Sequence, residues 1–295
     1  MGQSSQALRT RIKSVNSTRK ITKAMEMIAN AKLVKQRNKM EANREYAQRL
    51  QDVVDEIAEN NPGVESRFIR KNNGSKTLTI VFCSDLGLCG GYNQNVLKKA
   101  REELDPEDPV LLIGTSLYRP MTEEGFRIVN EEVLEGVKIV SSDRTNFMTL
   151  KDFVVYGTSL YEAGEIDKFQ VLYTRFVNTM TFRPALDVLL PCEMNQKAKE
   201  AQKEKEKDSV HVETLFEPDP ETILDHLIPM MIQDVVYADW MESTTAEQGS
   251  RRVAMKTATD NADELSSELM LEYNKVRQAS ITQEITEIVG GSEAV

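Results

Sequence analysis

The first sixty residues carry the hydrophobic pattern of one long coiled-coil helix. No glycine or proline occurs between Gln3 and Asn60, a run of 58 residues. The gaps between apolar positions are often 3, 4 or 7, with an irregular phase. These positions are Leu8, Ile12, Val15, Ile21, Met25, Ile28, Leu33, Met40, Ala47, Leu50, Val54 and Ile57. The pattern predicts a helix of about 85 Å, which the Asn-Pro-Gly at 61–63 ends.

The last quarter of the chain predicts a second helix of this kind. In the sequence Glu-Pro-Asp-Pro-Glu at 217–221, Asp219 has the place of the N-cap and Pro220 that of the first helical residue. Between Pro220 and residue 290, the only proline is Pro229 and the only glycine is Gly249. We expect Pro229 to kink the helix without ending it.

The two predicted helices differ in length. Gly290-Gly291 is expected to end the second helix, so that Asp219–Val289 spans 71 residues, 13 more than the first. If the bases of the two helices align, the second extends on the order of 20 Å beyond its partner. A helix far longer than the average of about 11–12 residues cannot be buried in a small domain. It must pair with another helix or enter a partner protein.

Between the long helices, short hydrophobic runs predict an α/β domain. The expected strands are Lys76–Cys83, Val110–Gly114, Gln170–Val177 and Ala185–Leu190, and the expected helices are Tyr92–Leu104, a segment ending at Glu124, and Asn146–Ala163. The predicted fold class is therefore α/β, a long antiparallel coiled coil of the terminal helices plus a central Rossmann-like domain. We expect a coiled-coil helix at 1–61, the α/β domain at 62–217 and a coiled-coil helix at 218–295. A charged, low-complexity loop at 197–208 has no large apolar residue and is expected to be dispensable for assembly.

Charge is distributed unevenly along the chain. Residues 1–50 hold twelve Lys or Arg and three Asp or Glu, a net charge of +9, whereas the whole chain carries −10. This asymmetry indicates an interaction surface. The alternative is a solvated helix face whose charges pair with acids on the partner helix. Nucleic acid is a poor candidate for the partner, because Tyr46 is the only aromatic residue in the first sixty.

The glycine-rich segment after the first predicted strand is the strongest candidate for a ligand site. Gly87, Gly90 and Gly91 could form a phosphate cradle. Their spacing is not GxGxxG, however, and no Gly-Lys-Ser/Thr follows. The alternative is a tight turn that needs the positive φ of glycine. Asp85 in the same segment is better explained by helix capping than by acid/base chemistry, because no His or carboxylate lies near it in sequence.

The remaining chemistry is sparse. Cys83, Cys89 and Cys192 have no CxxC spacing, which favours small buried residues in a reducing cytosolic compartment over a disulfide or zinc site. No catalytic, cofactor-binding or metal-binding residue is predicted. No stretch approaches the roughly 20 apolar residues of a membrane span. The basic N-terminus has no apolar signal-peptide region, and we expect no transit peptide.

Four segments together resemble one known family. They are Lys20–Met27 (KITKAMEM), Asp85–Asn93 (DLGLCGGYN), Val253–Ala262 (VAMKTATDNA) and Tyr273–Gly291 (YNKVRQASITQEITEIVGG). In this order they are similar to the γ subunits of F-type ATP synthases, and the resemblance covers essentially the whole chain. The loop at 197–208 is longer and more charged than is usual in bacterial members. The cysteine-bearing regulatory insert of chloroplast members is absent, so that a bacterial member is expected.

The resemblance implies a rotor subunit without an active site or cofactor. In the family, the paired terminal helices form a central shaft inside a ring of alternating α and β subunits. The central domain sits against the ε subunit and the membrane ring of c subunits. Rotation of the shaft couples ion flow through the c ring to ATP synthesis or hydrolysis on the catalytic β subunits. The chain is then expected at the cytoplasmic face of the bacterial cell membrane, as a peripheral protein. The alternative is a coiled-coil scaffold with a nucleotide-binding α/β domain.

The resemblance also implies contact residues for coupling. Arg277 and Gln278 match family positions that engage a loop of β. Arg251 matches an arginine of the shaft, although Arg252 beside it competes for that assignment. Lys20, Lys23 and Met25 match the family's N-terminal segment, which lies near acidic loops of β.

Overall fold

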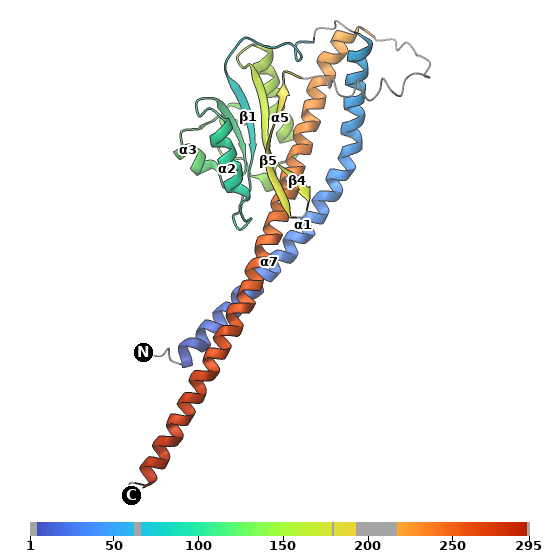
Figure 1. Cartoon of the computed structure of the whole chain (residues 1–295). Helices are drawn as coiled ribbons and strands as arrows, with labels where there is room; N and C mark the ends of the chain where they lie inside the picture. The colour runs from blue at the N-terminus through green and yellow to red at the C-terminus, as the bar shows by residue number, and fades with distance from the viewer. Residues whose placement is uncertain (1–4, 62–65, 179, 193–216, 294–295) are drawn as a thin grey trace. The chain divides into compact units, whose positions relative to one another are not determined.

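The computed structural model of this chain describes residues 5–61, 66–178, 180–192 and 217–293 (Figure 1). The charged loop expected at 197–208 lies outside these residues. The contacts divide the chain into two units. We call residues 1–31 and 251–295 the paired-helix unit, and residues 32–250 the α/β unit. The two long terminal helices each contribute to both units.

The α/β unit contains a five-stranded sheet in the order β3-β2-β1-β4-β5. Its strands are β1 (Thr77–Phe82), β2 (Pro109–Ile113), β3 (Arg127–Ile128), β4 (Lys168–Asn178) and β5 (Thr181–Leu190). The first four run parallel, and β5 is antiparallel to β4. The four predicted strands are confirmed, and the mostly parallel sheet confirms the predicted α/β class. Strand β3 was not predicted, because two residues give no alternation to recognise.

Both faces of this sheet are covered. Alternate residues of a strand point to opposite faces, and in β1 Ile80 enters one hydrophobic cluster while Val81 enters another. The first cluster packs on α5 (Phe147–Glu162) and on segments of the two long helices; the second packs on α2 (Tyr92–Glu103) and α3 (Tyr118–Glu123). Figure 1 shows α2 and α3 on one side of the sheet and α5 on the other. Two further short helices, α4 (Asn130–Val133) and η1 (Ser142–Arg144), were not predicted.

The terminal helices are α1 (Ser5–Asn60, 56 residues) and α7 (Pro220–Glu293, 74 residues). The predicted N-cap is confirmed, because the carboxylate of Asp219 accepts hydrogen bonds from the backbone N–H and the hydroxyl of Thr222, each at 2.8 Å. As predicted, α7 continues through Pro229. The end predicted at Gly290-Gly291 is wrong, since the helix runs on to Glu293. A glycine keeps its backbone N–H and weakens a helix by only about 1 kcal/mol. Within the described residues, no helix combines the length and the apolar character that crossing a bilayer requires.

Gly249, the single glycine predicted inside α7 before residue 290, has a packing role in the α/β unit. A Cβ atom at this position would lie 2.7 Å from ring atoms of Phe182 in β5. The ring of Phe182 also packs near that of Phe176, with their centroids 5.9 Å apart. The absence of a side chain at Gly249 therefore lets the β4–β5 hairpin approach the helix closely.

A buried carboxylate lies where β4 and β5 meet α7. Asp239 is buried, and its Oδ2 has no hydrogen-bond partner among the described residues. Burial, followed by repulsion from Asp187 and Glu242, raises the pKa of Asp239 well above its usual range, and Arg175 opposes this only in part. Arg175 is already engaged, because its guanidinium donates to Asp187 Oδ2 at 3.1 Å and to the Tyr173 hydroxyl at 2.8 Å.

Candidate functional site

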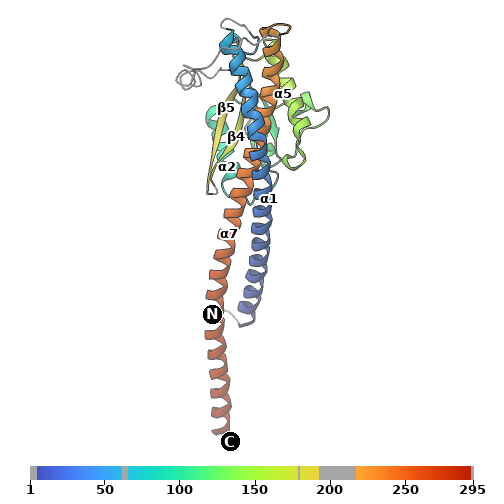
Figure 2. The same cartoon turned by 90° about the vertical axis from the view of Figure 1, so that its right-hand side faces the viewer.

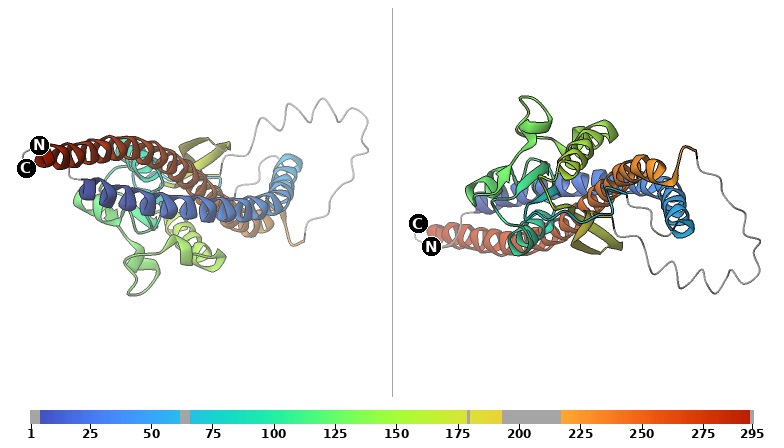
Figure 3. Two further views of the ribbon diagram at one scale, coloured as in Figure 1. Left: turned by 90° about the horizontal axis from the view of Figure 1, so that it is seen from below. Right: turned by 90° about the horizontal axis from the view of Figure 1, so that it is seen from above.

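The seam of the paired-helix unit follows a heptad repeat that begins apolar and turns polar. On α1 the spacing of 4 and 3 runs through Leu8, Ile12, Val15, Arg19, Thr22, Glu26 and Ala29. Leu8 and Ile12 pack with Leu269 of α7 in a small buried cluster, against which Val15 and Tyr273 rest. This antiparallel contact confirms the predicted coiled coil of the terminal helices. In Figure 2 and in the views from below and above in Figure 3, these two segments run side by side.

Polar groups cross the middle of this seam. The Ser266 hydroxyl donates to Asn16 Oδ1 at 3.3 Å, and that of Thr259 donates to the Thr22 hydroxyl at 2.8 Å. Between these two crossings lies an ion pair of 2.9 Å between Arg19 Nη1 and Asp263 Oδ1. Hydrogen bonds therefore replace apolar packing over about two turns of each helix.

Two predicted seam residues of α1 instead face away from the seam. Ile21 and Ile28 are 61% and 58% exposed, although their apolar character had placed them on it. The prediction was wrong because it followed apolar residues, whereas the heptad begun at Leu8 passes through polar ones. Met25 is half-buried, Lys20 is exposed, and the Lys23 ammonium pairs with Glu26 at 2.9 Å. This surface of α1 therefore combines exposed aliphatic side chains with lysines.

The C-terminal part of α7 is exposed to solvent. Every residue from Arg277 to Val289 is exposed. Figures 1 and 2 show this segment continuing past the N-terminal end of α1, as the predicted difference in length requires. The hydroxyls of Thr282 and Thr286 each donate to the carbonyl one turn back, at 2.9 and 2.8 Å. The segment, called the α7 tip below, thus exposes Ile281, Ile285 and Ile288 on a helix with only three charged residues.

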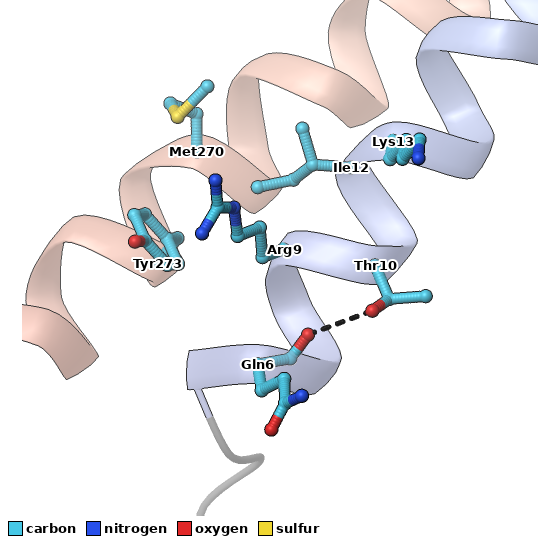
Figure 4. A pocket seen from close by; sticks show the side chains of 7 residues that line it. All are labelled: Gln6, Arg9, Thr10, Ile12, Lys13, Met270 and Tyr273. Atoms are coloured by element: carbon cyan, nitrogen blue, oxygen red, sulfur yellow. Dashed lines mark hydrogen bonds between the residues drawn. The ribbon is translucent and has the colours of Figure 1, made fainter.

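A cleft of about 760 Å³ opens where α1 begins beside α7. Its lining, shown in Figure 4, consists of Gln6, Arg9, Thr10, Ile12, Lys13, Met270 and Tyr273. The Arg9 side chain reaches from α1 toward Met270 and Tyr273 on α7 (Figure 4). We call this the end cleft. Nothing in the sequence patterns singled it out, because it arises only when the two helices pair in this register.

The six residues predicted for coupling do not all share the same exposure. Arg277 and Gln278 lie on the exposed α7 tip, and Lys20 and Lys23 are exposed on α1. Arg251 differs, because only 8% of its surface is exposed. Arg252 beside it is partly exposed, with a buried Nε atom that has no partner among the described residues. The predicted coupling residues therefore lie on two surfaces of the paired-helix unit, one on α1 and one on the α7 tip. Arg251 lies on neither.

The glycine-rich turn of the α/β unit is tied to a neighbouring loop by hydrogen bonds of Asp85. Asp85 does not cap α2, whose N-cap Gly91 has no side chain. Its carboxylate accepts instead from the Ser141 hydroxyl at 2.7 Å and from the backbone N–H of Ser142 at 3.0 Å and Asp143 at 2.9 Å. The helix it serves is thus η1, which sequence spacing could not indicate.

Positive φ values in this turn fall at Gly90, as the turn prediction requires, and also at Leu88. All three cysteines are buried and none forms a disulfide, and burial raises the pKa of the Cys83 thiol to about 12. The prediction of small buried cysteines is therefore confirmed. Among the described residues, no three His, Cys, Asp or Glu side chains converge as a metal site would require.

Two very long terminal helices that pair in one unit, with a mostly parallel α/β sheet in the other, define the class of coiled-coil proteins that carry an α/β domain between their terminal helices. The family model for ATP synthase matches residues 4–295. The chain is 40% identical to the ATP synthase gamma chain of Alkaliphilus metalliredigens, with 100% of both chains covered. It is 39% identical to the sodium-ion-specific ATP synthase gamma chain of Acetobacterium woodii, again over 100% of both. The chain belongs to the ATP synthase gamma chain family.

Solved structures agree on the fold. A chain of the Euglena gracilis mitochondrial ATP synthase, in an assembly of OSCP, F1 and c-ring, superposes with a TM-score of 0.66 at 17% identity, covering 98% of this chain and 94% of that one. A chain of the Tetrahymena thermophila mitochondrial ATP synthase central stalk and c-ring gives 0.53 at 25% identity, covering 81% and 99%.

Proposed function

We propose that this chain is the rotating central shaft of the F1 part of an ATP synthase. The shaft couples ion flow through the membrane c ring to ATP synthesis or hydrolysis on the catalytic β subunits. The observation that carries the proposal is the α7 tip, because the residues from Arg277 to Val289 are exposed beyond the end of α1. A protruding helix with aliphatic side chains and few charges suits a seat inside a ring of other subunits. Membership of the gamma chain family supports the same assignment.

In this proposal the chain is a non-catalytic subunit of the enzyme. Its partners are the alternating α and β subunits around the shaft, the ε subunit and the c ring, and it needs no cofactor of its own. It lies at the cytoplasmic face of a bacterial cell membrane, as a peripheral protein. In this proposal the helices at 1–61 and 218–295 form the shaft, and the domain at 62–217 docks on the ε subunit and the c ring.

We assign the coupling contacts to two surfaces. Arg277 and Gln278 at the base of the α7 tip are proposed to engage a loop of β. Lys20, Lys23 and Met25 on α1 are proposed to face acidic loops of β, since charge complementarity steers and orients such contacts. The burial of Arg251 suits a supporting role inside the shaft better than direct contact.

Co-purification tests the proposed function. An affinity-tagged form of this chain is expressed together with the α, β and ε subunits of the same organism. We expect the tag to recover all of them as a complex that hydrolyses MgATP. A variant that lacks residues 277–295 is the matched control. It should fold, because residues 277–289 are all exposed, and it should recover less α and β. If the full-length chain is recovered without the α, β and ε subunits, the proposed function is wrong.

A further inference from the structure

The end cleft combines a basic wall with an apolar floor. Arg9 and Lys13 stand on α1, and Ile12, Met270 and Tyr273 provide the apolar surface. Met270 is 45% exposed. The cleft therefore offers a partner one exposed apolar side chain and two positive charges. We propose that the end cleft binds an acidic segment of a ring subunit, which pairs its carboxylates with Arg9 and Lys13 and rests an apolar side chain on Met270. The inference deepens the proposed function and rests on it, because the shaft assignment supplies the surrounding subunits.

The charge of the cleft selects an acidic occupant. Residues 5–25 of α1 hold six Lys or Arg and no Asp or Glu. Among the described residues, no carboxylate lies within ion-pair distance of Arg9 or Lys13. Glu268 and Glu272 of α7 each stand two residues from Met270, and therefore about 200° around the helix from it. These acids point away from the cleft and leave its positive charge uncompensated.

The cleft also continues into the proposed coupling surface. Arg277 follows Met270 by seven residues, which is nearly two complete helical turns, so that both lie on one face of α7. The basic residues thus extend from Lys13 and Arg9 on α1 to Arg277 on α7. An extended acidic segment could follow this line, with guanidinium groups that form charge-assisted hydrogen bonds to carboxylates. The chain's own residues 1–4, Met-Gly-Gln-Ser, contain no carboxylate side chain to fill the cleft.

Site-specific cross-linking in the assembled complex tests the proposal. Thr10→Cys places a thiol in the cleft wall, and a photoreactive thiol reagent labels it selectively because Cys83, Cys89 and Cys192 are buried. We expect the cross-linked peptide to come from an acidic segment of a ring subunit. Addition of Arg9→Gln and Lys13→Gln should lower the yield at least fivefold, as the loss of two ion pairs allows. In the Thr10→Cys parent alone, the yield should fall as salt rises.

The matched control removes the same charge elsewhere. Arg11 and Lys275 are exposed and lie on faces turned away from the cleft, and the double change to glutamine should leave the cross-linking yield unchanged. Cross-links to a non-acidic segment or to the chain's own terminus would overturn the proposal. So would an equal loss of cross-linking yield in the two double variants, or a yield that does not change with salt. If the complex forms without an acidic cross-link, the cleft assignment alone fails. If the wild-type chain recovers no ring subunits, the proposed function fails with it.

Discussion

Asp239 lies in surroundings that disfavour its ionised form. It is buried beside Asp187 and Glu242, and Arg175 is shared with Asp187 and Tyr173. The raised pKa means that folding favours the protonated carboxyl group. The folded chain then holds a proton that the unfolded chain releases above a pH of about 4. Stability is therefore lost as the pH rises from that value toward the folded pKa.

We expect Asp239→Asn to stabilise the chain at neutral pH. The amide removes the titratable charge and keeps the shape. The gain should therefore equal the free energy of holding the proton, about 1.4 kcal/mol for each pH unit between about 4 and the folded pKa. Urea unfolding followed by circular dichroism between pH 4 and pH 9 measures it. The difference between variant and wild type should be smallest near pH 4 and grow toward neutral pH. Asp152→Asn is the control, since Asp152 is exposed on α5 and does not contribute to the pKa of Asp239. A variant advantage that does not change with pH would contradict the role of the proton.

Gly157 gives a second prediction at this scale. A Cβ at this position in α5 would lie 2.6 Å from the ring of Phe169, which is fully buried and cannot move aside. Gly157→Ala gains about 1 kcal/mol of helix propensity and loses about 1–3 kcal/mol through overpacking. We expect a net loss in the free energy of unfolding, measured in urea. Gly87→Ala, with open space around its Cβ, should change it by less than about 0.5 kcal/mol.

At the scale of elements, the sequence predicted the long helices and main strands because their signals are local. The absence of helix breakers defined α1, and the spacing of Asp219 and Pro220 defined the start of α7. The seam was only partly predictable. Its polar section is satisfied by partners more than 230 positions away in sequence, such as Thr259 for Thr22, and spacing alone cannot find such pairs. The same limit hid the end cleft and the contact of Asp85 with η1.

The apolar end of the seam should unfold locally, without unfolding of the sheet. Leu8, Ile12 and Leu269 form its buried cluster, and polar crossings follow. Leu269→Ala removes packing worth about 2–5 kcal/mol in a buried site. We expect residues 5–15 to exchange their amide hydrogens faster, while β1 and β4 keep their protection. Leu271→Ala is the control, since Leu271 is 65% exposed. Equal deprotection of the sheet would show instead that the helix pair and the sheet unfold together.

At the scale of the whole molecule, the chain combines two very long helices with an α/β domain, and its proposed task is to transmit torque. A shaft that turns within a ring requires contacts that form and release. Exposed lysines and half-exposed apolar residues suit such contacts, because exposed ion pairs contribute only about 0–1 kcal/mol each. This view separates two properties that a mutation can affect: assembly of the complex, and coupling between rotation and catalysis.

Met25→Lys should separate these two properties. Met25 is half-buried on α1, and the nearest carboxylate in sequence, Glu26, already pairs with Lys23. A lysine at this position would add a positive charge with no partner in the chain, which acidic loops of β could then bind too strongly for smooth rotation. We expect the complex to assemble with normal subunit composition, while the number of ions pumped per ATP hydrolysed falls severalfold in membrane vesicles. Met25→Leu, which conserves volume and charge, should pump as the wild type does. Wild-type pumping per ATP in Met25→Lys, or a failure of that variant alone to assemble, would show that the proposed coupling role of this surface is wrong.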